Sequence, residues 1–250
     1  MAKQVGIIQF NGALGETIGA PSIKGYQVIK KRPVAVHNPN TIKQRTQRTV
    51  FAAAGATSST IPVSALAGLR PLAKGKKCSI RNAFTNALLA DNVFTPTASA
   101  QGEITTRVEW ENVKFSRGSM PIPSFGTPDF ETPNTIDLSV TIPEDVNPRL
   151  SNIIIVVVNR EGTPAEYKVE NVPCWDSQNN RVITSIAVIC PSHWNGMQVQ
   201  VYGYIQTWND QSDVDAYYQA RAWNAVGDIR ILESNAQYSN TKHIGVGRMG

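Results

Sequence analysis

The sequence predicts a mainly β protein, an antiparallel β-sandwich of the Ig-like or jelly-roll-like kind, preceded by a basic N-terminal arm with a small helical region. Two observations carry this prediction. About seven short candidate strands with turn-forming clusters between them follow residue 104, which is typical of a sandwich. The first hundred residues are small, basic and thinly hydrophobic. We therefore expect an N-terminal part, residues 1–100, and a sandwich domain, residues 101–250, that folds alone and carries an insertion near 208–235.

The N-terminal part begins with short strands that glycines interrupt, because glycine permits tight turns. Residues 26–36 read as extended, and Pro33 favours an edge strand or an unpaired arm. Asn38, Asn40 and Thr41 form a helix-start signal, since their side chains can accept hydrogen bonds from the amides of a first turn. We expect a helix over residues 41–54, closed by Gly55, and two shorter helices over residues 62–73 and 79–90.

The C-terminal part alternates strands with turn clusters rich in Pro, Asn, Asp and Gly. Residues 153–158 are all apolar, which marks a central strand covered on both faces, or one buried at a subunit contact. Residues 198–205 alternate, so one face can be buried and the other polar or aromatic. The segment 210–230 is too long for a hairpin turn and favours a helical insertion. The candidate strands are residues 104–115, 135–142, 152–158, 166–172, 181–190, 197–207 and a last one at 238–246.

Charge is strongly segregated along the chain. Residues 17–90 contain twelve Lys and Arg and no Asp or Glu. Residues 1–100 hold 13 basic residues against Glu16 and Asp91, a net charge of +11, whereas residues 101–250 hold 11 against 17 acids, a net charge of −6. An uncompensated positive field attracts polyanions or an acidic protein surface. A solvated basic surface without a dedicated partner is the plainer alternative.

The basic residues of the first part are the candidate contact residues. Closely spaced cations with Gln and Thr donors between them suit phosphate and sugar contacts, and the scarcity of aromatic residues predicts sequence-independent binding. The same cations could instead dock on the acidic part of a neighbouring copy, and both partners stay open. The predicted nucleic-acid or subunit contacts are Lys24, Lys30, Lys31, Arg32, Lys43, Arg45, Arg48, Lys74, Lys76, Lys77 and Arg81.

Patterns of catalysis are missing from the sequence. The glycine-rich stretch at residues 12–19 lacks the Gly-Lys-Ser/Thr ending of a phosphate-binding loop. The three histidines have no carboxylate beside them in sequence that could orient them, and Glu109 and Glu111, which flank Trp110, favour a solvated strand face over a glycosidase pair. We expect no enzyme activity, no catalytic residues and no cofactor.

Cysteine spacing and hydropathy restrict the remaining classes. Three widely spaced cysteines fit no metal or redox pattern, so we expect reduced, buried thiols and no metal site. The longest apolar run is too short to span a bilayer, and no standard signal peptide precedes it, so we expect no membrane contact.

Several motifs resemble a family of uncharacterised proteins, a domain of unknown function, from Bacteroidota and their phages. The resemblance rests on Gly12-Ala-Leu-Gly15, residues 24–30, Arg32-Pro33 and the helix start at residues 38–41 with Gln44, Gln47, Arg48 and Phe51. Towards the C-terminus it rests on residues 153–159, Pro191-Ser-His-Trp-Asn-Gly196 with Val199 and Tyr202, and Ser239-Asn240. It covers the chain nearly end to end, except that residues 208–235 look inserted. The resemblance implies a basic N-terminal module with a β-sandwich, in a bacterial or phage genome, and carries no catalytic residues.

Together these patterns predict a non-enzymatic structural protein, a capsid or capsid-associated component of a bacteriophage virion, whose basic arm contacts nucleic acid or neighbouring subunits. The expected partners are further copies of the chain, as a homo-oligomer, or other virion proteins, with nucleic acid possible through the N-terminal half. Two alternatives stay open. One is a sequence-independent nucleic-acid-binding protein of the bacterial cytoplasm. The other is a carbohydrate- or surface-binding sandwich module that uses exposed Tyr and Trp residues of the C-terminal half.

Overall fold

The computed structural model describes residues 2–4, 12–14, 17–21, 27–31, 40–100, 102–161 and 164–250. The chain divides into two compact units, residues 1–44 and residues 45–250. Lys24, Arg32 and Pro33 lie outside the described residues.

The described strands of the first unit form one antiparallel sheet in the order β1-β4-β3-β2. Strand β4 pairs with β1 on one side and with β3 on the other, so the expectation of an edge strand or unpaired arm is wrong for residues 27–31. The bounds are β1 (Ala2–Gln4), β2 (Gly12–Leu14), β3 (Thr17–Pro21) and β4 (Gln27–Lys31).

The helical segment follows, and its starts agree with the sequence. The Gln44 amide donates to Thr41 Oγ1 over 3.3 Å at the start of α1, and the Asn82 amide donates to Ser79 Oγ over 3.1 Å at the start of α3. Helix α1 continues past Gly55, where the end was expected, because Gly55 keeps a helical backbone. The elements are α1 (Ile42–Thr60), the 3₁₀ helix η1 (Val63–Leu69), α2 (Arg70–Lys76) and α3 (Ile80–Ala90).

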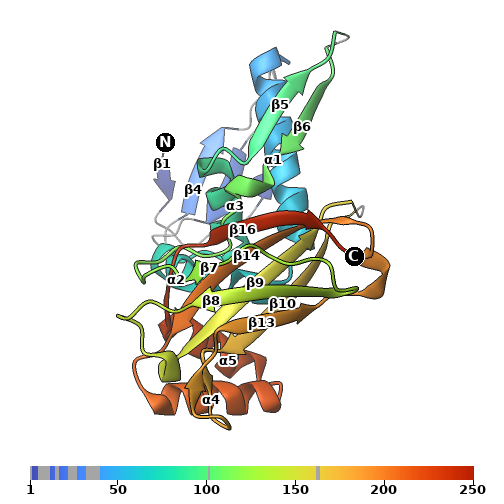
Figure 1. Cartoon of the computed structure of the whole chain (residues 1–250). Coiled ribbons are helices and arrows are strands. Elements are labelled where there is room, and N and C mark those ends of the chain that lie inside the picture. The colour runs from blue at the N-terminus through green and yellow to red at the C-terminus, as the bar shows by residue number, and fades with distance from the viewer. Residues whose placement is uncertain are drawn as a thin grey trace. The chain divides into compact units, whose positions relative to one another are not determined.

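The predicted antiparallel sandwich is confirmed. One sheet has the order β10-β9-β14-β15, with β16 also pairing with β14, and the other has the order β13-β8-β7. Figure 1 shows β8 and β13 lying across β9, β10 and β14. The strands are β7 (Ser124–Phe125), β8 (Thr135–Thr141), β9 (Ser151–Asn159), β10 (Glu166–Pro173), β13 (Ser185–Ile189), β14 (Gln198–Thr207), β15 (Gln237–Tyr238) and β16 (Lys242–Arg248).

A hydrophobic core fills the space between the two sheets. Ile136, Leu138 and Val140 alternate along β8 with exposed residues, as a strand with one covered face should. They meet Ile153, Ile155 and Val157 of β9, together with apolar residues of β13 and β14.

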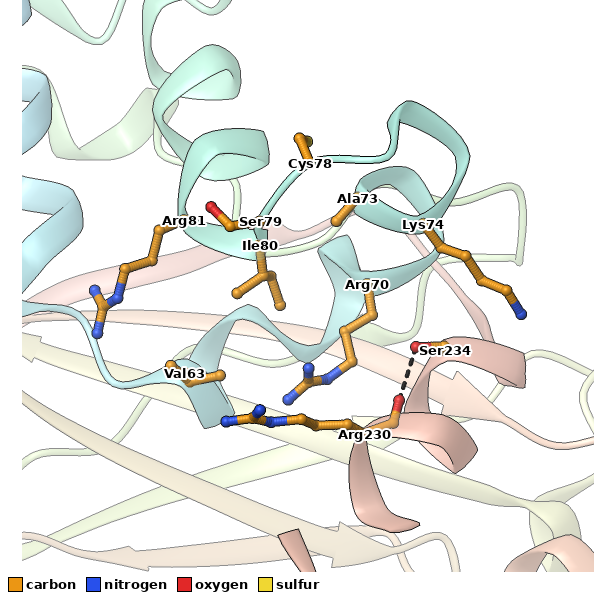
Figure 2. Close-up of a pocket in the computed structure, with 10 residues that line it drawn as sticks. All are labelled: Val63, Arg70, Ala73, Lys74, Cys78, Ser79, Ile80, Arg81, Arg230 and Ser234. Carbon is orange, nitrogen blue, oxygen red and sulfur yellow. Dashed lines mark hydrogen bonds between the residues drawn. The ribbon is translucent and has the colours of Figure 1, made fainter. Parts of the chain in front are cut away.

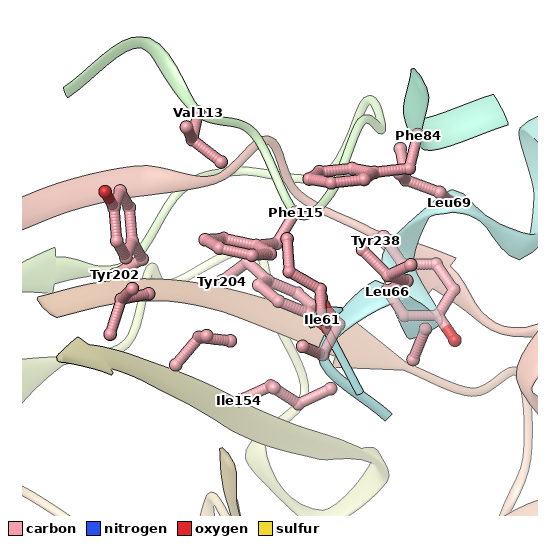
Figure 3. Close-up of a cluster of buried hydrophobic side chains, with 14 of the residues drawn as sticks. Ile61, Leu66, Leu69, Phe84, Val113, Phe115, Ile154, Tyr202, Tyr204 and Tyr238 are labelled. Carbon is pink, nitrogen blue, oxygen red and sulfur yellow. Dashed lines mark hydrogen bonds between the residues drawn. The ribbon is translucent and has the colours of Figure 1, made fainter. Parts of the chain in front are cut away.

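A second core lies on the opposite face of β9 and β14, where the helical segment packs. Figure 3 shows Ile61, Leu66 and Phe84 from that segment facing Tyr202, Tyr204 and Ile154. Both tyrosines are fully buried, and their hydroxyls donate to main-chain carbonyls, Tyr202 to Trp110 (2.6 Å) and Tyr204 to Ala65 (3.2 Å). The apolar run 153–158 is thus buried on both faces, as predicted.

The helical segment and the sandwich share this second core and therefore belong to one domain. Residues 45–90 cover one face of β9 and β14 and belong to the same compact unit as the sandwich. That unit begins at Arg45, and so the boundary expected near residue 100 does not coincide with the observed one. Residues 208–235, expected as an insertion, contain α4 (Gln211–Ala222) and α5 (Val226–Asn235).

Short elements complete the second unit. The expected strand 104–115 ends at Val108, where β6 gives way to a 3₁₀ turn, and β6 pairs with a strand the sequence did not indicate. Figure 1 shows this β5–β6 hairpin running alongside α1. These elements are β5 (Phe94–Ala98), β6 (Ile104–Val108), η2 (Trp110–Asn112), η3 (Pro148–Leu150), β11 (Trp175–Asp176), β12 (Arg181–Val182) and η4 (Ser192–Trp194).

Candidate anion-binding site

The predicted contact residues fall into separate groups. Lys30 and Lys31 lie in β4 of the first unit, and Lys43 is exposed in the first turn of α1. Arg45 and Arg48 follow along α1. The last group consists of Lys74 and Lys76 in α2, Lys77 at its end and Arg81 in α3.

Arg45 and Arg48 line a pocket of about 530 Å³ between α1 and the β5–β6 hairpin. Arg45 Nη1 donates to the Gly102 carbonyl over 3.2 Å, which ties the helix to the hairpin. Glu103 lines the same pocket and offsets part of its positive charge. This group is therefore a weaker anion site than the one at α2 and α3.

The strongest candidate is a pocket of about 440 Å³ between η1, α2, α3 and α5 (Figure 2), hereafter the basic pocket. Four of its lining side chains are cations, Arg70, Lys74, Arg81 and Arg230, and none of its lining residues is acidic. Figure 2 shows Arg70 and Arg230 both extending toward Val63, whereas Lys74 and Arg81 extend away on either side. Lys76 and Lys77 follow Lys74 in the sequence, and both are exposed.

Local structure fixes the positions of these side chains. Arg70 is the first residue of α2, just after η1, and Ser79 caps the N-terminus of α3 with Arg81 in its first turn. Helix α5 brings Arg230 to the opposite wall, and Ser234 Oγ donates to the Arg230 carbonyl over 2.7 Å. Positive charge at a helix N-terminus adds to that of the cations and favours an anion there.

The four cations differ in their partners. Arg70 Nε forms an ion pair with Glu233, and the two side chains are 12% and 7% exposed. Burial raises the pKa of the Glu233 carboxyl, and the Arg70 guanidinium opposes that rise. Lys74 Nζ donates to Asn235 Oδ1 over 3.2 Å, and Arg81 donates to the Ser58 carbonyl.

Arg230 is the cation available to a ligand. Its residue is exposed, and its guanidinium has no hydrogen-bond or ion-pair partner among the described residues. Arg70, Arg221 and Arg230 all act electrostatically on Glu233, so three guanidinium groups share one carboxylate. A second anion near Arg230 would compensate the remaining charge.

Sequence reasoning missed Arg70 and Arg230 as contact residues. Arg70 belongs to the acid-free span but has no basic neighbour in sequence, and Arg230 lies in the part with net negative charge. Helix α5 places Arg230 next to residues of α2 that are far away in the chain. No local charge pattern could have indicated this pair.

The acidic pair at Trp110 does not form a strand face. Glu109 precedes η2 and Glu111 lies within it, so the two carboxylates do not share the strand geometry that was expected. Glu109 Oε1 lies 3.6 Å from Arg107 Nε, so the two side chains form an ion pair.

His193 has a carboxylate partner that is distant in sequence. Its Nε2 lies 2.7 Å from Glu166 Oε2, which also accepts a hydrogen bond from Trp194 Nε1. These hydrogen bonds lower the pKa of the Glu166 carboxyl. Sequence could not indicate this contact because Glu166 comes from β10. The two side chains are 60% and 44% exposed, so we interpret the pair as one that anchors η4 to β10.

Comparisons with protein-family models, with curated proteins and with solved structures find no match to this chain. The resemblance to the Bacteroidota and phage family therefore stays a prediction. Within the described ranges, no group of three or more His, Cys, Asp or Glu side chains could hold a metal ion. No single helix in the described part of the chain is long and apolar enough to cross a membrane, and one sharply bent pair, residues 42–60 with 63–76, passes on length and composition alone.

Proposed function

We propose that this chain is a non-enzymatic structural protein that binds the phosphate groups of a polyanion, nucleic acid above all, through the basic pocket. The observation that carries the proposal is the Arg230 guanidinium, which has no hydrogen-bond or ion-pair partner among the described residues and lines, with Arg70, a pocket that has no acidic lining residue. A guanidinium presents several fixed N–H donors that match phosphate oxygens, and bidentate contacts of this kind are strong. Lys74, Lys76 and Lys77 would extend the contact along a phosphate chain.

The expected binding is independent of base sequence. The residues that line the basic pocket include no aromatic ring on which a base could stack. Phosphate contacts position a protein on nucleic acid and carry no sequence information. Most of the affinity would then come from counterion release and would depend strongly on salt.

The role we propose for this binding is structural, in the capsid or a capsid-associated layer of a bacteriophage virion. Its support is the segregation of charge along the sequence, +11 over residues 1–100 and −6 over residues 101–250, together with a sandwich rich in uncharged polar residues and the family resemblance. Opposite charges on two parts of one chain favour head-to-tail contact between copies, which closes into rings or extends into shells.

Salt-dependent binding to a short random-sequence DNA duplex tests the proposal. About five phosphate contacts predict a slope of roughly −3.5 to −4.5 for the logarithm of affinity against the logarithm of salt concentration. Arg230→Ala should weaken binding to every sequence alike and make the slope shallower by about one. Arg181→Ala is the matched control, since Arg181 is 73% exposed in its side chain and lies on β12.

Two outcomes would count against the proposal. Equal affinity for the DNA duplex at low and moderate salt would rule out binding through phosphate contacts. A loss in the double variant Lys30→Ala with Lys31→Ala, without any loss in Arg230→Ala, would assign the contact to the N-terminal sheet and not to the basic pocket.

A further inference from the structure

A second pocket, of about 480 Å³, has different chemistry from the basic pocket. It lies where β9 begins, between η3, the β10–β11 connection and α4, and we call it the sandwich-end cleft. Its lining contains one cation, Arg149, and one carboxylate, Asp215, so its formal charge is zero. Phosphate has no reason to prefer it.

Two aromatic side chains line the sandwich-end cleft. The guanidinium carbon of Arg149 lies 4.5 Å from the centre of the Trp175 ring, which holds the two side chains together. The Trp175 indole N–H has no hydrogen-bond partner among the described residues and is not enclosed. Across the cleft, the Tyr218 hydroxyl donates to Asn152 Oδ1 over 2.8 Å, which fixes the tyrosine against β9.

Helix α4 supplies the acceptors. Gln211 Nε2 donates to Asp215 Oδ1 over 2.9 Å, which leaves Asp215 Oδ2 without a partner among the described residues. The residues that line the cleft therefore include a carboxylate with one oxygen, and an indole with an N–H, that have no partner among the described residues. A ligand that satisfies both must present donors and acceptors together.

We infer that the sandwich-end cleft binds a neutral sugar ring. Each sugar hydroxyl can donate to Asp215 or accept from Trp175 and Arg149, and the C–H face of a pyranose ring can lie against an aromatic side chain. An apolar ligand would leave the polar groups of the lining unpaired, which is costly. A few polar groups around an aromatic wall are the usual composition of a small-molecule site. This inference is independent of the phosphate contact at the basic pocket.

The burial of most other Tyr and Trp residues in the C-terminal half supports this location. Tyr202, Tyr204, Tyr217, Tyr238, Trp194 and Trp208 are all buried and cannot stack on a ligand. These six residues therefore do not belong to the exposed Tyr and Trp residues that a carbohydrate- or surface-binding module was expected to use. Trp223 is 74% exposed, but it is not part of the cleft.

Saturation-transfer NMR with the full chain tests the inference, with glucose, galactose, mannose and N-acetylglucosamine as probes. We expect at least one of these sugars to bind with a dissociation constant of about 1 mM, which suits a single ring with a few hydrogen bonds. Asp215→Asn keeps the shape of the side chain and should weaken binding about tenfold, as the loss of one charge-assisted hydrogen bond predicts. Trp175→Ala should abolish the signal.

Each variant has a matched control. Asp228→Asn changes an exposed carboxylate on α5, and Trp223→Ala removes an exposed indole, both outside the cleft. The controls should bind the sugar as the unchanged chain does. Three results would overturn the inference: no saturation transfer to any of the four sugars, equal losses in variants and controls, or binding of adenosine in preference to every sugar. Inorganic phosphate that competes with the sugar would overturn it as well.

Discussion

Val156→Asp is expected to leave the chain without a cooperative native state. Val156 is completely buried in β9, the central strand, on the face that the helical segment covers. Its cross-strand neighbours are Val169 and Tyr202, and neither carries a positive charge that could compensate a carboxylate. Burying an unpaired charge costs several kcal/mol even after the site relaxes, and total stability is only about 5–15 kcal/mol.

Urea unfolding followed by near-UV circular dichroism measures this effect. Ser185→Asp is the control, because it adds the same charge at an exposed position of β13. Surface substitutions of that kind usually change stability by less than about 0.5 kcal/mol. An unchanged unfolding midpoint in Val156→Asp would show that β9 is not enclosed on both faces.

Removal of the helical segment should also abolish cooperative folding. In a fragment of residues 101–250, Ile154, Val156 and Tyr204 lose the residues that cover them. The Tyr204 hydroxyl also loses its acceptor, the Ala65 carbonyl. Each large apolar side chain that returns to water loses about 1.5–3 kcal/mol of stabilisation. A fragment of residues 45–250 retains the whole compact unit and should unfold in one transition. A single cooperative transition in the 101–250 fragment would instead restore the boundary expected from the sequence.

The longer fragment also tests assembly. If copies join through the basic first unit, native mass spectrometry at low salt should give the full chain as an oligomer and the 45–250 fragment as a monomer. A full chain that stays monomeric at high concentration would contradict assembly of the purified protein.

The sequence predicted the elements whose local signals were strong. The all-apolar run 153–158 indicated a strand buried on both faces, and Thr41 and Ser79 marked the helix starts correctly. Strand β5 escaped prediction because Pro96 within it argues against a strand. Tyr202 and Tyr204 were expected on a polar or aromatic face, since alternation alone does not reveal that helices cover that face.

The candidate site was harder to predict than the fold. Lys74, Lys76, Lys77 and Arg81 stood out as a basic cluster, but the pairing of Arg70 with Glu233 and the position of Arg230 depend on how α5 packs against α2. The contact between His193 and Glu166 depends in the same way on tertiary structure. Side chains from distant segments can be brought together only by the fold.

The most direct test of phosphate binding in the basic pocket is alkylation of Cys78, which is half-buried and lines that pocket. Burial raises the pKa of Cys174 to about 12 and that of Cys190 to about 11, so at about pH 8 both should stay protonated and unreactive. Iodoacetamide should then label Cys78 alone, and mass spectrometry of peptides measures the rate. Bound random-sequence DNA should slow this labelling in the unchanged chain and not in Arg230→Ala. Labelling of Cys78 at the same rate with and without bound DNA would contradict the proposed site.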